Sequence, residues 1–200
     1  WNAGDIFVRV HGEALIPNVS TNSWNFSGQA FRKADLKGDT IGLPEIDFSY
    51  FLTKNIALET LCCYAWSTIH TAGSIGFLGP LADTGILPFT LLLQYHFDGL
   101  GAFKPYLGVG GTYVLFVNTN EKPLFHDLQV HNTGGVVFQA GFDYHLTGNW
   151  FANFDIKQYL IGTDASVLLG TNKVSTHVNL DATIAGAGIG YRFGNYVPLK

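Results

Sequence analysis

The segment Thr183–Phe193 constrains the fold more than any other part of the chain. Its odd positions are mostly apolar or aromatic, and its even positions are mostly glycine plus one arginine. Successive side chains of a β-strand point to opposite faces, so this strand has one apolar face and one nearly bare face. A strand with lipid outside and a crowded lumen inside has this pattern.

The same alternation recurs in eight segments, which are separated by turn-forming residues. We predict strands at about 5–16, 40–52, 55–70, 86–98, 104–118, 136–147, 149–163 and 179–193. The connections alternate between short turns (near 53–55, 98–101 and 147–149) and long loops (about 17–39, 71–85, 119–135 and 164–178). This layout predicts an all-β fold: an eight-stranded antiparallel up-and-down transmembrane β-barrel with short periplasmic turns and long extracellular loops.

The composition agrees with a barrel in a membrane. Charged residues make up 13% of the chain and aromatic residues 14%, whereas about 25% of residues are charged in a typical soluble domain. We find no run of about 18 uncharged apolar residues, so a transmembrane helix is not expected. The chain begins at Trp1 without a leader-like segment, and we expect a protein exported to the bacterial outer membrane whose signal peptide has been removed. The net charge of −4 argues against a nucleic-acid partner.

Strand parity predicts which side chains face lipid and which face the lumen. The outward parity of the fourth strand carries Phe89, Leu91 and Leu93. Aromatic residues near the periplasmic strand ends would form a girdle at the membrane surface: Tyr50, Tyr95, Phe97, Tyr144, Trp150, Tyr191 and Phe193.

The inward parity carries charged residues in the half of each strand nearer the short turns. Eight strands leave an interior that side chains can fill, and buried charges must be paired. We therefore predict a polar periplasmic plug formed by Arg9, Glu45, Asp47, Glu59, Asp143, Asp155, Lys157 and Arg192.

Further from the short turns the inward parity becomes apolar, and the long loops are also rich in apolar residues. A hydrophobic funnel above a charged plug would conduct water poorly and could receive a small hydrophobic molecule. The predicted channel residues are Leu61, Ala65, Leu92, Val114, Phe116, Val137 and Tyr159.

Several ordered stretches resemble the OmpW family of eight-stranded outer-membrane proteins, which includes barrels associated with alkane uptake. The matching stretches are 3–9, 53–59, 87–95, 104–110, 139–144, 149–150 and 190–193. The resemblance implies a narrow hydrophobic channel entered from outside, a closed periplasmic end, and lateral release of apolar solutes through the wall into the membrane.

Three features depart from the family pattern. Members often have a proline in the third strand, where the wall is thought to open, and Ala65 stands at the matching position here. Asp181-Ala182 replaces a common Asp-Pro pair, and Gly134 stands where a tryptophan is frequent. We expect residues 1–193 to form one domain and residues 194–200 a C-terminal tail.

No catalytic, metal or cofactor site is predicted. The loop histidines His126, His131 and His177 lack zinc-ligand spacing, and no nucleophile is evident beside His96, which has inward parity and would approach Glu45 or Asp47. The expected partners are membrane lipids and small hydrophobic solutes, with a monomeric barrel. Two alternatives remain: a structural or adhesive barrel whose extracellular loops bind a partner, and a soluble carrier of the lipocalin type, which would place the apolar face inside.

Overall fold

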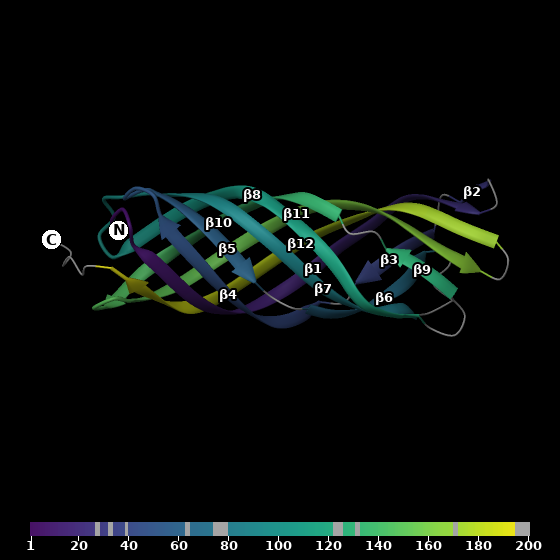
Figure 1. Ribbon diagram of the computed structural model, residues 1–200, viewed down its shortest axis with the longest axis horizontal. Helices are drawn as coiled ribbons and strands as arrows, with labels where there is room; N and C mark the ends of the chain where they lie inside the picture. Colours follow the sequence, from purple (N-terminus) through teal and green to yellow (C-terminus); the bar gives the residue numbers. More distant parts are fainter. Residues whose placement is uncertain are drawn as a thin grey trace.

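The chain folds into a closed antiparallel barrel whose wall has eight members (Figure 1). The computed structural model describes residues 1–26, 29–31, 34–38, 40–62, 65–73, 80–121, 126–130, 133–169 and 172–194. The strands are β1 (Ile6–Phe26), β2 (Gln29–Phe31), β3 (Ala34–Gly38), β4 (Ile41–Phe51), β5 (Ile56–Cys62), β6 (Ala65–Gly73), β7 (Pro80–His96), β8 (Phe103–Glu121), β9 (His126–Val130), β10 (Thr133–Thr147), β11 (Trp150–Leu169) and β12 (Asn172–Phe193).

The barrel closes because the first and last strands pair. β1 pairs with β12 from Ile6↔Phe193 to Phe26↔Val174, and it pairs with β4 on its other side. Going round, the order is β1, β4, β5 with β6, β7, β8, β10, β11 and β12. The remaining short strands β2, β3 and β9 pair beyond this wall. The predicted eight-stranded antiparallel barrel is confirmed.

The short connections lie at one end, together with Trp1 and the end of β12 (Figure 1). Gly99, Gly101 and Gly148 adopt φ of 86°, 65° and 57° in two of these turns, a backbone region that favours glycine. Because short turns face the periplasm in outer-membrane barrels, we call this the periplasmic end.

All four predicted long loops are wrong in part, because strands continue into each of them. β7 begins at Pro80, and β8 extends to Glu121. β1 extends to Phe26, β11 extends to Leu169, and β12 begins at Asn172. Threonine and valine recur there, as in the pairs Thr21↔Val178 and Trp24↔Thr176, and such residues favour strand pairing beyond the bilayer as well. The predicted third strand, 55–70, corresponds to β5 and β6 on either side of residues 63–64.

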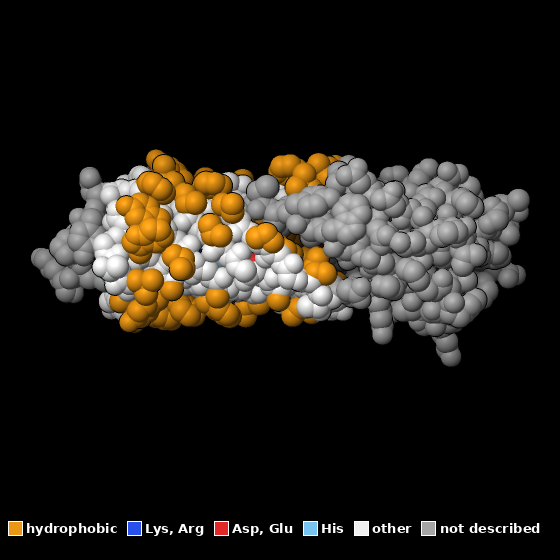
Figure 2. All heavy atoms as spheres, turned by 90° about the horizontal axis from the view of Figure 1, so that it is seen from below, with side chains coloured by type: hydrophobic (Ala, Val, Ile, Leu, Met, Phe, Trp, Pro, Cys, Tyr) orange, Lys and Arg blue, Asp and Glu red, His pale blue; other side chains and the backbone are white. Residues whose placement is uncertain are grey.

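The outward face of the barrel is apolar. On the face seen in Figure 2, hydrophobic side chains are spread over the described half of the barrel at the periplasmic end. Leu91 is 57% exposed and Ile189 56%, exposures that are unfavourable in water and suit contact with lipid chains. The predicted girdle residues Tyr50, Tyr95 and Trp150 are about half exposed at the periplasmic end. Among the described residues no helix is long and apolar enough to cross a membrane.

Candidate functional site

The lumen contains three successive layers of side chains, and the lowest is aromatic. Phe7, Phe51 and Phe151 are fully buried, and the ring centroid of Phe7 lies 4.6 Å from Phe51 and 4.8 Å from Phe151. The ring of Trp1 packs edge-on against Phe7 at 4.6 Å. These rings close the periplasmic end of the lumen as an aromatic floor. The sequence analysis did not predict this layer, although Phe7 and Phe151 share the inward parity of Arg9 and Lys157.

Arg9 is the centre of the second layer, which is ionic. Its Nε and Nη2 donate to the two oxygens of Asp143, both at 3.2 Å. Its Nη1 donates to Asp47 Oδ1 and to Glu59 Oε2, both at 3.0 Å, and to Ser49 Oγ at 2.6 Å. Arg9 therefore connects β1 with β4, β5 and β10, so it ties together opposite sides of the barrel.

Lys157 is the second cation of this layer. Its Nζ lies 2.7 Å from Glu45 Oε1, 2.8 Å from Asp155 Oδ2 and 3.3 Å from Glu13 Oε1. All four side chains are buried. This group links β11 with β1 and β4, next to the Arg9 group.

Two glutamines join the Arg9 and Lys157 groups. Gln139 Nε2 donates to Glu59 Oε1 at 2.9 Å and to Asp155 Oδ2 at 2.7 Å. Gln94 Nε2 donates to Glu59 Oε2 at 2.7 Å and to Gln139 Oε1 at 2.8 Å. The layer is thus a single hydrogen-bonded network across the lumen, the arrangement that buried charges require.

The structure brings seven of the eight predicted plug residues into this network; Arg192 lies apart. Arg192 pairs with Asp5, with Nε 3.6 Å from Oδ2, and its guanidinium lies 5.8 Å from the centre of the Trp1 ring. In the β1–β12 register Arg192 stands opposite Phe7, at the level of the aromatic floor.

The expected approach of His96 to Glu45 or Asp47 is wrong. Its Nε2 lies 3.1 Å from Gln94 Oε1, and its Nδ1 lies 3.7 Å from Asp143 Oδ2. β7 is separated from β4 by β5 in the wall, which places His96 on the other side of the Arg9 group.

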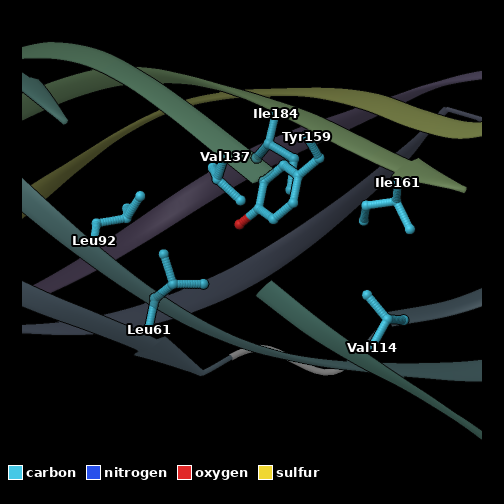
Figure 3. Close-up of a cluster of buried hydrophobic side chains, with 7 residues drawn as sticks. All are labelled: Leu61, Leu92, Val114, Val137, Tyr159, Ile161 and Ile184. Atoms are coloured by element: carbon cyan, nitrogen blue, oxygen red, sulfur yellow. The ribbon is translucent and has the colours of Figure 1, made fainter. Parts of the chain in front are cut away.

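The third layer is apolar. Figure 3 shows side chains from opposite walls converging on a common region of the lumen. Its members are Leu61, Leu92, Val114, Val137, Tyr159, Ile161 and Ile184. The predicted channel residues Ala65 and Phe116 belong to β6 and β8, but their side chains lie outside the described ones. Ile161 and Ile184 were missed, although they share the inward parity of Tyr159 and Arg192.

The wall around this layer has a seam in its hydrogen bonding. β4 pairs with β5 from Ile46↔Cys62 to Phe51↔Ala57. Beyond that point the residues of β4 from Ile41 to Glu45 pair with β1, and β6 pairs with β7 and, at its far end, with β3. Within the described backbone no pairing joins Ile41–Glu45 to β6. We call this interval the β4–β6 seam.

Prolines flank the seam on both sides. Pro44 of β4 lies two residues beyond Ile46, which makes the last described pair with β5, and Pro88 of β7 lies next to Phe89, the last residue of β7 that pairs with β5. In antiparallel strands, alternate residues direct their N–H groups to opposite neighbours.

Nearby hydrogen bonds show toward which neighbouring strand an N–H group at each proline position would point. Leu52 N donates to Ile56 O on the β5 side, whereas Phe51 N donates to Asp5 O on the β1 side; Pro44 has the parity of Leu52. His96 N likewise donates to Asn55 O on the β5 side, and Pro88 has the parity of His96. Proline has no N–H. Neither proline can therefore donate a backbone hydrogen bond toward the β5–β6 side of its strand.

The fold and the layered lumen define the class of protein: an eight-stranded barrel with an apolar outer band, suited to an outer membrane, whose lower lumen is filled by aromatic and ionic layers. The comparisons with known proteins give the family. The OmpW family model matches residues 2–193, and the chain belongs to this family.

The relatives are outer-membrane proteins. An uncharacterized outer-membrane protein of Sinorhizobium fredii is 42% identical over 189 residues, which cover 93% of this chain and 79% of the relative. Outer membrane protein W of Vibrio cholerae is 30% identical over 200 residues, covering 95% and 89%. The crystal structure of OprG from Pseudomonas aeruginosa superposes with a TM-score of 0.89 at 28% identity, covering 97% of this chain and 98% of OprG.

Proposed function

We propose that this outer-membrane barrel takes up small hydrophobic molecules from outside and releases them sideways into the membrane. The apolar layer would receive the solute, and the ionic layer and aromatic floor would stop its passage to the periplasm. The observation that carries the proposal is the β4–β6 seam with its two prolines, because it supports an exit at the level where the lumen is apolar.

An apolar path joins the lumen to the seam. Leu15 packs against the apolar layer and also against Leu43, which is buried on the part of β4 that pairs with β1 and not with β6. Leu61 of the apolar layer lies at the end of β5 that is nearest the seam, because the next residue, Cys62, is the last residue of β5. A hydrophobic solute could therefore move from the lumen to the wall along apolar side chains, with Glu13, which stands opposite Leu43 in the β1–β4 register, as the charged residue at the lower edge of the path.

The experiment measures uptake of radiolabelled n-octane and of a polar sugar of similar size. Cells lacking the protein are compared with cells producing the wild-type barrel. We expect the barrel to accelerate entry of octane and not of the sugar. Equal entry of octane with and without a folded barrel would refute the channel, and faster entry of both tracers would show that the lower lumen leaks.

The exit is tested by restoring the missing donors with Pro44→Val and Pro88→Val together. If the prolines keep the seam open, a strand-favouring residue with an N–H strengthens pairing there, and we expect slower octane entry. The matched control is Pro105→Val, because Pro105 lies in β8 at the periplasmic end and accepts a hydrogen bond from Phe97. Unchanged octane entry in the double variant would exclude the seam as the exit and leave the channel itself intact.

A further inference from the structure

A buried histidine lies among the carboxylates of the ionic layer. His11 is 3% exposed, and its Nδ1 lies 3.2 Å from Asp47 Oδ2, 3.5 Å from Glu13 Oε1 and 3.9 Å from Glu45 Oε1. Neither of its ring nitrogens makes a hydrogen bond of good geometry. The imidazole therefore sits among three carboxylates, which it can pair with as an imidazolium ion or join as a metal ligand when neutral.

Each carboxylate around Lys157 also has one oxygen that makes no hydrogen bond. Lys157 contacts one oxygen each of Glu13, Glu45 and Asp155. The other oxygens, Glu13 Oε2, Glu45 Oε2 and Asp155 Oδ1, are buried and make no hydrogen bond. Burying a carboxylate oxygen without a partner costs free energy. One small region of the lumen therefore holds several oxygens that a bound cation would stabilise.

The charge balance of the buried residues favours an additional cation. Among the side chains that the structure describes, seven buried carboxylates face four buried lysine or arginine side chains. Most of these carboxylates lie in the ionic layer, around Arg9 and Lys157. Uncompensated negative charge inside a barrel destabilises the fold, and a bound cation would reduce it.

The geometry points to a divalent transition-metal site. His11, Glu13 and Asp155 offer ligand atoms within 4.8 Å of one another, and so do His11, Glu45 and Asp47. We propose that the ionic layer binds one first-row divalent ion such as Zn²⁺ or Mn²⁺, with His11 as the ligand common to both groups. Mixed imidazole and carboxylate ligands suit these ions, whereas Ca²⁺ and Mg²⁺ prefer oxygen alone.

The ion would link three wall members in the lower lumen. His11 and Glu13 come from β1, Glu45 and Asp47 from β4, and Asp155 from β11. Lys157 would keep the carboxylate oxygens that it already contacts. The competing arrangement is a protonated His11 that serves as a third internal cation without a metal.

The test uses the untagged barrel refolded in detergent in the presence of Zn²⁺, because the site is buried and the ion must enter during folding. After dialysis, bound zinc is measured by elemental analysis, and affinity by competition with a zinc-sensitive dye. The variants are His11→Gln and, as a matched control, His96→Gln, which removes a second buried lumen histidine that belongs to neither ligand group. The shift in electrophoretic mobility on heating verifies that each barrel is folded.

We expect one zinc ion per barrel for wild type and His96→Gln, and at least about tenfold weaker binding for His11→Gln. Wild type that retains no more zinc than His11→Gln would overturn the site and leave the protonated histidine as the third cation. If His11→Gln does not fold, Glu13→Gln replaces it with the same expectation. Co²⁺ absorption provides an independent readout, since loss of the imidazole ligand changes the visible spectrum and a merely structural role would not. These measurements detect metal and not uptake, so the inference stands or fails independently of the channel.

Discussion

Replacing Arg9 with glutamine is expected to lower the free energy of unfolding by about 3–5 kcal/mol, the usual cost of removing one partner from a buried ion pair. Arg9 is fully buried and donates to three carboxylates, Asp47, Glu59 and Asp143. Glutamine cannot neutralise them, and it also loses the contact of the guanidinium with the Phe7 ring, whose centre lies 5.3 Å away. The magnitude therefore comes mainly from carboxylates left buried without a counter-charge.

The assay is equilibrium unfolding in urea of barrels inserted in lipid vesicles, followed by tryptophan fluorescence. The matched control is Lys54→Gln, which removes a cation from a pair of similar length: Lys54 Nζ lies 3.1 Å from Asp98 Oδ2, but its side chain is 70% exposed. Burial would raise the pKa of Asp98, yet hydrogen bonds from Lys54 and Asn55 outweigh it and the pKa is lowered.

A lowered pKa means that this surface pair stabilises the fold at neutral pH and that its contribution is lost as the pH falls through the pKa of the folded state. Both variants are therefore compared at pH 7, where the exposed pair is worth less than about 1 kcal/mol. Equal stability losses for Arg9→Gln and Lys54→Gln would refute the view that burial makes the Arg9 network important.

Two further predictions concern the wall of the barrel. Gly110→Ala should cost about 1–3 kcal/mol, because a Cβ there would overlap the backbone oxygen of Leu91, whereas Gly12→Ala meets nothing within 4 Å; the same unfolding assay should separate the two. Leu91→Arg should cost about 2–4 kcal/mol on the lipid face, while Leu100→Arg, equally exposed at 56% but in a periplasmic turn, should change stability little. Similar losses at the two leucines would contradict the placement of the lipid band.

Strand parity was sufficient to predict most of the fold and much of the lumen. A period of two assigns each residue of a long strand to one face, and the turns fix where each strand begins. The same rule could have found His11 and Glu13, which share the parity of Arg9 on β1. They were overlooked because histidines were compared by their spacing along the sequence, whereas the ligand groups form between strands.

Parity also assigns Phe7 and Phe151 to the lumen, since they share the parity of Arg9 and Lys157. It does not show that their rings pack together across β1 and β11. The family resemblance places the opening of the wall at a proline of the third strand, where this chain has Ala65. The prolines of the seam instead stand in the flanking strands, and only the cross-strand registers show that Pro44 and Pro88 both lie just beyond the residues that pair with β5.

The positions of the ionic layer and the seam are linked through consecutive residues of β4. Glu45 binds Lys157 in the lumen, and Pro44, the next residue, begins the part of β4 that pairs with β1 alone. The seam therefore runs from the ionic layer at Glu45 outward to Ile41, and Leu43 between them packs against Leu15 at the margin of the apolar layer. Under the proposed function, the residues that block the direct route therefore stand beside the lateral one. Glu45→Gln, which weakens the Lys157 group, should leave octane entry unchanged and should still exclude the polar sugar, because the aromatic floor closes the lumen below it.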